Sequence, residues 1–354
     1  MLSQPTLIIS HKKVEANIDR MLAKIVPGRT IFRPHFKTHQ SVEVGNIFRK
    51  KGVSKITVSS VSMAEFFIDA GWKDITIAFP VNLREIEKIN ILASRIQLNL
   101  LVESEYSAQF LLEKIKNKVG VFIKIDTGYH RTGLLPENKT EIDKIVSVFS
   151  KSKYIDFKGF LTHAGNTYSA KGKAEILSII NDARDKLNSL KHQFIGSFPN
   201  IITSYGDTPS CSLADNFDGF DEIRPGNFAY YDVMQYHIGS CSLNEIAVAV
   251  VCPVVAVHPE RNELVIYGGS VHFSKELIAA DNGFNLFGYV VKLEKNTWSE
   301  PIAGAYVSAL SQEHGIVKMP SPVINQTKPG DIIGILPIHS CLTADCLKEN
   351  QVII

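Results

Sequence analysis

The chain has 354 residues, of which 45% are hydrophobic and 21% are charged, and its formal net charge at pH 7 is +2. This composition is typical of a folded globular protein and argues against a disordered chain. The nearly balanced charge, without a basic block, argues against a nucleic-acid-binding or membrane-surface role.

Membrane insertion and export are not predicted either. The longest apolar run, AVAVVCPVVAV at residues 247–257, has 11 residues and contains a proline, whereas a bilayer span needs about 17–25 residues. The opening residues MLSQPTLIIS lack the charged and long apolar regions of a signal peptide. Five scattered cysteines do not suggest a disulfide framework. We therefore expect a cytoplasmic protein with reduced thiols.

The first two thirds of the chain alternate between helical and strand-like segments. Apolar residues at positions 14, 18, 21, 22 and 25 follow the period of a helix. Eight short β-rich runs follow, each trailed by polar residues and an amphipathic stretch. The runs are TIFRPH, KITVSS, DITIAFP, IQLNLLV, GVFIKID, FKGFLTHAG, IITSYG and DEIRPG. This alternation predicts a (β/α)8 barrel, and the absence of a glycine-rich phosphate loop after the first strand disfavours a doubly wound sheet.

After about residue 240 the pattern changes to β-branched runs separated by Gly, Pro and Asn, without a convincing helix. We predict two domains: a barrel over residues 10–240 and an all-β domain over residues 241–354. Residues 1–9 contain most of the run PTLIIS (residues 5–10), which precedes the first barrel helix and needs a strand partner. We expect these residues to join the β domain.

Residues with chemical capacity follow five of the predicted strands, where barrel active sites are built. They lie in RPHFKTH, DTGYHRTG, THAGNTY, SYGDTPS and RPGNFAYYD. Lys37 at the first strand end, between two histidines, is expected to be partly desolvated and nucleophilic, as a Schiff-base lysine requires. A lone lysine at a strand end is more often solvated, so this prediction depends on the other strand ends.

The loops after the seventh and eighth strands, a common phosphate site in barrels, carry glycines and the hydroxyls of Ser204, Thr208 and Ser210. A phosphate there and a lysine on the first strand together suggest pyridoxal 5'-phosphate (PLP). Taken alone, such glycine turns would more often be ordinary loops.

In this light the chain resembles the fold type III PLP enzymes, and within them the D-serine dehydratase and D-threonine aldolase family, with alanine racemase as a more distant relative. The motifs that carry the resemblance are RPHFKTH, DTGYHRTG, THAGNTY, GDTPS, EIRPGNFAYYD, SQEHG and GDIIGILPIHSC. The resemblance covers nearly the whole chain and implies that Lys37 is the Schiff-base lysine. It also implies a cofactor site formed by Arg131 near the ring oxygen, His163 against the ring, Tyr168 and Tyr231 in the pocket wall, and Gly206, Thr208, Gly226 and Asn227 around the phosphate.

The motif IHSC places His339 and Cys341 two residues apart. If this segment is a strand, both side chains point to the same face, and an imidazole with a thiolate suits Zn²⁺. The bare pattern is weak by itself. The resemblance strengthens it, because the related dehydratases carry His and Cys there whereas the aldolases carry Asp in place of the Cys. The resemblance further implies that His314, in SQEHG, is a catalytic residue.

We therefore predict a PLP- and Zn²⁺-dependent dehydratase that converts a D-3-hydroxy amino acid such as D-serine to a 2-keto acid and ammonia. Lys37 would first anchor the cofactor and then act as the base. Three alternatives stay open: a metal-dependent D-threonine aldolase, an amino-acid racemase and a non-catalytic PLP carrier. A racemase would need a second base, and the context of Tyr306 does not resemble the racemase motif. By analogy with related enzymes we expect a homodimer.

Overall fold

The computed structural model describes residues 2–279 and 285–354, which form two compact units. The barrel unit comprises residues 20–37 and 45–226, and the β unit comprises the described residues of 2–19, 38–44, 227–279 and 285–354. The predicted domain boundaries lay at residues 10 and 240. In the structure, residues 10–19, 38–44 and 227–240 pack with the β unit.

The barrel unit contains an eight-stranded parallel sheet in the order β2-β9-β8-β7-β6-β5-β4-β3. Its strands are β2 (Ile31–Phe32), β3 (Lys55–Val58), β4 (Asp74–Pro80), β5 (Gln97–Val102), β6 (Val119–Lys124), β7 (Ile155–Leu161), β8 (Ile202–Tyr205) and β9 (Glu222–Ile223). Six strands fall within their predicted runs, while β6 and β7 begin one and two residues before theirs, and the predicted barrel is confirmed. The two ends of the sheet meet at a parallel bridge between His35 and Thr57.

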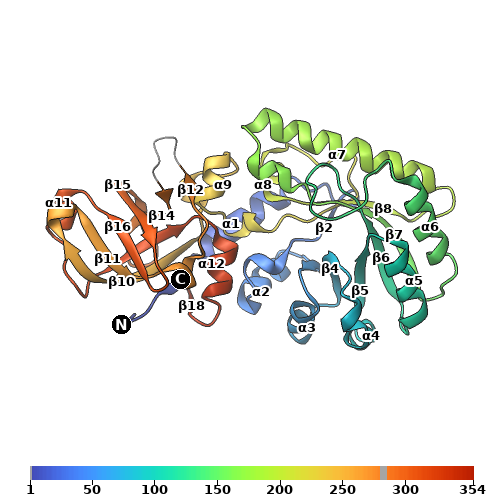
Figure 1. Cartoon of the computed structure of the whole chain (residues 1–354), viewed down its shortest axis with the longest axis horizontal. Helices are drawn as coiled ribbons and strands as arrows, with labels where there is room; N and C mark the ends of the chain where they lie inside the picture. The colour runs from blue at the N-terminus through green and yellow to red at the C-terminus, as the bar shows by residue number, and fades with distance from the viewer. Residues whose placement is uncertain (1, 280–284) are drawn as a thin grey trace. The chain divides into compact units, whose positions relative to one another are not determined.

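Helices cover the outside of this sheet (Figure 1). They are α2 (Val42–Lys50), α3 (Val61–Asp69), α4 (Ile86–Ala93), α5 (Glu105–Lys114), α6 (Lys139–Phe149), α7 (Lys173–Phe194) and α8 (Thr208–Leu213), whereas most of α1 (His11–Leu22) belongs to the β unit. Several begin at a side-chain cap: Ser60, Ser104, Asn138 and Asp207 each accept a hydrogen bond from the third residue beyond them. These caps satisfy backbone N–H groups that a helix start leaves without partners.

The interior of the barrel is filled by side chains. Leu101, Phe122 and Leu161 form a buried cluster contributed by β5, β6 and β7. Toward the amino ends of the strands, the Arg33 guanidinium donates to Glu222 and to Asp74, both at 2.6 Å. These buried ion pairs join the segment after β2 to the first residues of β9 and β4. The opposite ends of the strands carry the residues with chemical capacity.

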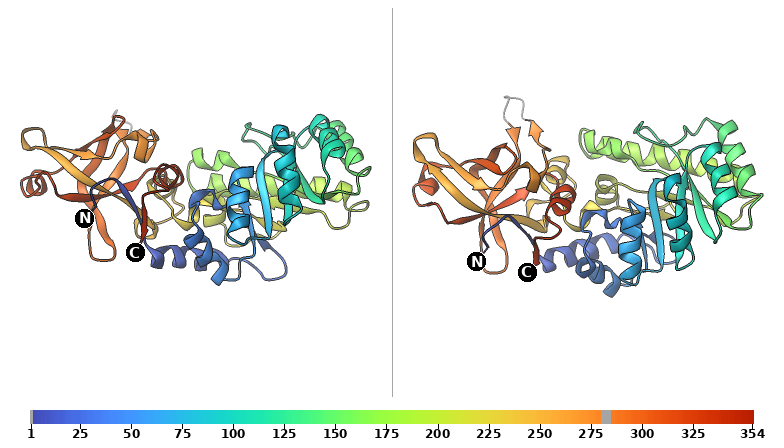
Figure 2. Two further views of the ribbon diagram at one scale, coloured as in Figure 1. Left: turned by 90° about the horizontal axis from the view of Figure 1, so that it is seen from below. Right: turned by 60° about the horizontal axis from the view of Figure 1, so that its bottom comes forward.

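The β unit is built on a second eight-stranded sheet, in the order β11-β16-β15-β14-β17-β10-β1-β18 (Figure 2). Its strands are β1 (Thr6–Ile9), β10 (Val248–His258), β11 (Glu263–Tyr267), β14 (Gly288–Leu293), β15 (Trp298–Leu310), β16 (His314–Lys318), β17 (Ile332–Pro337) and β18 (Gln351–Ile353), and a small separate pair consists of β12 (Ile278–Ala279) and β13 (Asn285–Leu286). The first strand, β1, pairs antiparallel with β10 and parallel with β18.

The expectation that the C-terminal region lacks helices is wrong. Short helices occur there at α10 (Ser270–Phe273), α11 (Ser321–Ile324) and α12 (Ser340–Cys346), and α9 (Val233–Ile238) lies just before this region. They are four to seven residues long, too short for helical periodicity to be recognised in the sequence. Among the described helices, none is long and apolar enough to cross a membrane.

Candidate active site

The segment RPHFKTH leaves β2 and forms a short 3-10 helix, η1 (Phe36–Thr38), that contains Lys37. The expected partial desolvation of Lys37 is not seen, because the residue is exposed. The two neighbouring histidines bond to the backbone: His35 Nδ1 accepts the N–H of Lys37 at 3.3 Å, and His39 Nδ1 accepts the N–H of Ser41 at 3.1 Å. Burial lowers the pKa of His39 to about 3. These histidines therefore shape the turn that presents Lys37.

His163 lies two residues beyond the end of β7. Its Nδ1 is 2.6 Å from the carbonyl oxygen of Gly206, which follows β8. Since a carbonyl only accepts, Nδ1 carries the proton and Nε2 carries the lone pair. Burial, together with the nearby charges of Lys37 and Lys124, lowers the pKa of His163 well below its ordinary value. The ring is therefore a neutral imidazole in one fixed tautomer.

The loop after β6 is organised by Asp126, whose Oδ1 accepts the backbone N–H groups of Gly128, Tyr129 and His130. Burial opposes ionisation of this carboxyl, but these hydrogen bonds outweigh it and lower the pKa of Asp126. The Tyr129 ring that the loop presents lies 5.9 Å, centroid to centroid, from the ring of His163.

Two residues predicted for the cofactor site contact this aromatic pair. The Arg131 guanidinium lies 5.0 Å from the centroid of the Tyr129 ring. The ring of Tyr168, in the 3-10 helix η3 (Gly165–Ser169), lies 6.5 Å from that of His163. The loops after β6 and β7 thus bring Arg131, His163 and Tyr168 close to one another around Tyr129.

Sequence reasoning missed two buried cations at the same ends of the strands. Lys124, the last residue of β6, is 6% exposed, and Arg224, just after β9, is 4% exposed. Burial and the nearby charges of Arg224 and Arg131 lower the pKa of Lys124 to about 7. The signal was present, since Lys124 interrupts the apolar stretch VFIKI at residues 121–125. This concentration of positive charge favours an anionic ligand.

Of the three hydroxyls predicted near the phosphate, only that of Thr208 is available. Ser204 Oγ donates to Glu222 and accepts from Arg224, both at 2.7 Å. The hydroxyl of Ser210 lies 2.8 Å from that of Tyr205. By contrast, Thr208 Oγ1 is buried and has no hydrogen-bond partner among the described residues. A buried hydroxyl without a partner is costly, and a phosphate oxygen would supply the missing hydrogen bond.

The glycines in this region allow close backbone approach. A Cβ atom on Gly206 would lie 2.9 Å from the carbonyl oxygen of Arg224, too close for any larger residue. Gly226 follows β9 and is the last residue of the barrel unit. Of the residues predicted to bind the cofactor, Lys37, Arg131, His163, Tyr168, Gly206, Thr208 and Gly226 belong to the barrel unit, and Asn227 and Tyr231 belong to the β unit.

In the β unit, the motif IHSC is not a strand as expected. Strand β17 ends at Pro337, His339 is the extended residue before α12, and Cys341 lies in the first turn of that helix. The argument from strand alternation is therefore wrong for this pair. Two residues at the start of a helix can still have neighbouring side chains, and the hydrogen bonds of His339 and Cys341 show what surrounds each of them.

Cys341 lies in a buried polar network. Its Sγ accepts a hydrogen bond from Asn227 Nδ2 at 3.4 Å and lies 3.3 Å from Thr38 Oγ1. The same amide of Asn227 donates to Asp232 Oδ2 at 2.6 Å, and the backbone N–H of Ser340 donates to that oxygen at 3.0 Å. Asn227 Oδ1 is buried without a partner among the described residues. Within the β unit, Asn227 thus contacts the cysteine of the predicted metal pair.

His339 contacts a carboxylate that the sequence did not suggest. Its Nδ1 lies 2.6 Å from Glu276 Oε2. Burial favours the neutral imidazole, but hydrogen bonds to Cys341 and Glu276 outweigh it and raise the pKa of His339 to about 11. The same contact lowers the pKa of Glu276. The described residues include no cluster of three His, Cys, Asp or Glu side chains arranged to hold a metal ion.

Two further predicted residues belong to the β unit. His314 is exposed and begins β16, where it pairs with Tyr267 across the sheet. Tyr231 is 6% exposed and has φ of 49°, a left-handed conformation that is unfavourable for a bulky residue. Its backbone N–H donates to the carbonyl of Asn227 at 2.7 Å. This turn keeps Tyr231 close to the network around Cys341.

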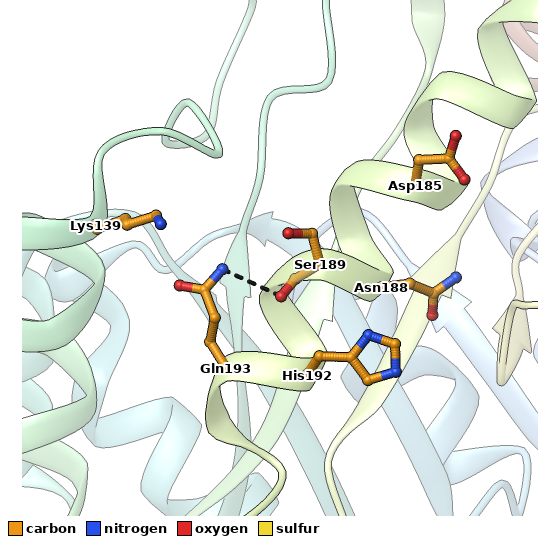
Figure 3. A pocket seen from close by; sticks show the side chains of 6 residues that line it. All are labelled: Lys139, Asp185, Asn188, Ser189, His192 and Gln193. Carbon is orange, nitrogen blue, oxygen red and sulfur yellow. Dashed lines mark hydrogen bonds between the residues drawn. The ribbon is translucent and has the colours of Figure 1, made fainter.

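A surface hollow of about 650 Å³ lies elsewhere on the barrel unit, along α7 (Figure 3). It is lined by Lys139, Asp185, Asn188, Ser189, His192 and Gln193. None of these is a predicted site residue, and Gln193 uses its amide to bond the backbone of Ser189 at 3.1 Å.

Comparison with known proteins places the chain in a family. Residues 9–233 match the model of the alanine racemase N-terminal domain, and residues 247–353 match a putative serine dehydratase domain. A D-serine dehydratase of Dictyostelium discoideum is 31% identical over 99% of this chain and 93% of its own length. The chain belongs to the D-serine dehydratase family. The resemblance inferred from the motifs is confirmed.

Solved structures extend the comparison within and beyond the D-serine dehydratase family. The D-threo-3-hydroxyaspartate dehydratase from Delftia sp. HT23 has a TM-score of 0.89 at 25% identity, with 98% of this chain and 93% of the other covered. Other structures of that enzyme are of a histidine-to-alanine mutant and of the metal-free form of a cysteine-to-alanine mutant. D-threonine aldolase from Filomicrobium marinum has a TM-score of 0.73 at 20% identity, covering 97% and 88%, and shares the fold.

Proposed function

We propose that this protein is a PLP- and metal-dependent dehydratase that converts a D-3-hydroxy amino acid to a 2-keto acid and ammonia. Relatives that match nearly the whole chain are a D-serine dehydratase and a D-threo-3-hydroxyaspartate dehydratase. The observation that carries the proposal is the environment of Cys341. Its sulfur lies beside Thr38, the residue that directly follows Lys37 in the chain.

The residues of the barrel unit fit PLP. The unpartnered hydroxyl of Thr208 and the close backbone approach at Gly206 suit a phosphate, and the cations Lys124, Arg131 and Arg224 favour its charge. Lys37 is exposed and sterically able to attach the cofactor aldehyde. When bound, PLP supplies an electron sink for negative charge that develops at the substrate α-carbon.

Individual side chains then have distinct tasks. The amine of Lys37, once released, takes the proton from the α-carbon of the substrate. His163, kept neutral by burial and held in one tautomer by Gly206, would lie against the cofactor ring without adding a positive charge. Arg131, which contacts Tyr129, and Tyr168, which contacts His163, line the proposed cofactor site. Gly226, Asn227 and Tyr231 complete the cofactor site in this proposal, and His314 is a further catalytic residue.

The metal is proposed to be Zn²⁺ bound by His339 and Cys341. An imidazole and a thiolate are a donor set that suits zinc, and the Asn227 amide donates to the sulfur as it would to a thiolate. The two substituted residues in the mutants of the Delftia enzyme, a histidine and a cysteine, are also two positions apart. When bound, the metal supplies Lewis acidity toward the β-hydroxyl of the substrate, which leaves.

A product assay tests the proposal. Purified protein is given D-serine, D-threonine and D-threo-3-hydroxyaspartate separately, with and without a chelator, and 2-keto acid is scored against glycine plus aldehyde. We expect keto acid that disappears with the chelator and returns with Zn²⁺. Glycine and aldehyde from D-threonine would instead identify an aldolase, the L-enantiomer as product would identify a racemase, and no turnover of any substrate would favour a PLP carrier.

We further propose a cytoplasmic homodimer, which is supported by analogy with related enzymes. Light scattering coupled to size-exclusion chromatography measures the mass in solution. A mass near twice that of the 39.3 kDa chain is expected, and a monomer would contradict the dimer.

A further inference from the structure

Glu276 makes the shortest described contact of His339. Its Oε2 lies 2.6 Å from Nδ1 of the ring, although the two residues are 63 positions apart in the sequence. Both side chains are partly solvent-exposed, at 45% for Glu276 and 31% for His339. Ion pairs in such surroundings contribute about 0–1 kcal/mol to stability. Stability of the fold is therefore a weak reason for this contact.

The segment that carries Glu276 is held in place against the helix that follows His339. Helix α10 ends three residues before Glu276, and the hydroxyl of Thr343 in α12 donates to the carbonyl of Phe273 at 3.3 Å. The backbone N–H of Glu276 donates to Ser274 Oγ at 3.2 Å. The carboxylate therefore reaches His339 from a backbone that is itself anchored to α12.

We propose that Glu276 is the positioning residue of the metal pair: it accepts the Nδ1–H of His339 and so directs the Nε2 lone pair to the metal. This inference rests on the proposed metal-dependent function. A histidine that binds a metal through one nitrogen commonly donates the other N–H to a carboxylate, which orients the ring and makes it a better ligand. Glu276 acts through His339 and is not itself assigned as a ligand, in keeping with the lack of a three-residue metal cluster in the described parts of the chain.

The test compares zinc affinity among matched variants. Zinc binding is measured by competition with a chromophoric chelator for the PLP-loaded wild type and for E276A, E276Q, H339A, C341A and E260Q. The E260Q control also removes a glutamate next to a histidine, since Glu260 lies 3.5 Å from His258 in the turn between β10 and β11. E276A removes charge and acceptor, whereas E276Q keeps an acceptor oxygen.

We expect E276A to weaken zinc binding by roughly 10- to 100-fold, E276Q to weaken it less, and E260Q to leave it unchanged. Because the ring orientation changes, the visible spectrum of the Co²⁺-loaded E276A protein should differ from that of the wild type. At saturating zinc, E276A should recover most of the wild-type turnover, as expected of a residue that positions a ligand.

The outcomes separate the two proposals. If the wild type binds no more zinc than C341A and H339A, the metal pair is wrong and the role of Glu276 falls with it. If the wild type binds zinc through both residues while E276A and E276Q bind it equally well, only the role of Glu276 is overturned. A lower melting temperature of E276A with unchanged zinc affinity and Co²⁺ spectrum would assign the contact to stability. If E276A does not fold, a zinc affinity and a Co²⁺ spectrum of E276Q equal to those of the wild type would overturn the role.

Discussion

The barrel unit and the β unit position their reactive side chains by different means. In the barrel unit, His163, Gly206 and Lys124 stand at or just after the ends of β7, β8 and β6, so the paired strands determine where they lie. In the β unit, His339 and Cys341 stand at the junction of β17 and α12, where side chains from distant segments surround them. A repeated backbone pattern creates the first arrangement, and a specific side-chain network creates the second.

The largest effect should come from Lys37. Lys37→Ala removes the amine that would attach PLP and serve as base, so we expect turnover to fall by about 10³-fold or more. The absorption band of covalently held cofactor should disappear as well. Lys50→Ala, an exposed lysine on α2, is the control and should keep both. A Lys37→Ala protein with the wild-type cofactor band would contradict the assignment.

Replacing Cys341 should impair the proposed metal function of the β unit without affecting cofactor binding by the barrel unit. Cys341→Ala removes a metal ligand, and we expect dehydration to fall by at least about 100-fold while the absorption of bound PLP is retained. Cys346→Ala gives a matched control, because this exposed cysteine lies on the same helix, α12. Keto-acid production is measured with added Zn²⁺. Full activity of Cys341→Ala would exclude the zinc role of the pair.

The two units also differ in how far the sequence predicts them. The eight barrel strands and the positions of Arg131 and His163 after them could be predicted, because alternating segments mark each strand end. The contact between His339 and Glu276 could not, since no local pattern links residues 63 positions apart. The helix α12 was missed because it has seven residues. The exposure of Lys37 was missed because His35 and His39 bond to the backbone, which their alternation with Lys37 does not reveal.

A smaller effect is expected at the phosphate loop of the barrel unit. Thr208→Val removes a buried hydroxyl that has no partner among the described residues, so the cofactor-free protein should be no less stable than the wild type. PLP affinity should fall by about 10-fold, the value of one hydrogen bond to a charged group. Thr140→Val, exposed on α6, is the control.

Equilibrium titration of PLP and thermal unfolding of the cofactor-free protein provide both measurements for Thr208→Val. The zinc affinity of the β unit should not change, because the substitution affects only cofactor binding by the barrel unit. A Thr208→Val protein that loses stability without its cofactor, and binds PLP as the wild type does, would assign the hydroxyl to the fold.

The smallest effect concerns the buried amine of Lys124. Its folded-state pKa is lowered from 10.5 to about 7, chiefly by burial, so between these values the unfolded chain binds the proton more tightly. Stability of the cofactor-free protein therefore rises with pH through this window. Relative to Lys124→Met, the wild type should gain roughly 1 kcal/mol in unfolding free energy between pH 7 and pH 8. Chemical denaturation at both pH values measures this difference, with the exposed Lys144→Met on α6 as control. An equal pH response in wild type and Lys124→Met would mean that Lys124 keeps its proton, and the barrel would then present a full positive charge to an anionic cofactor at every pH in this range.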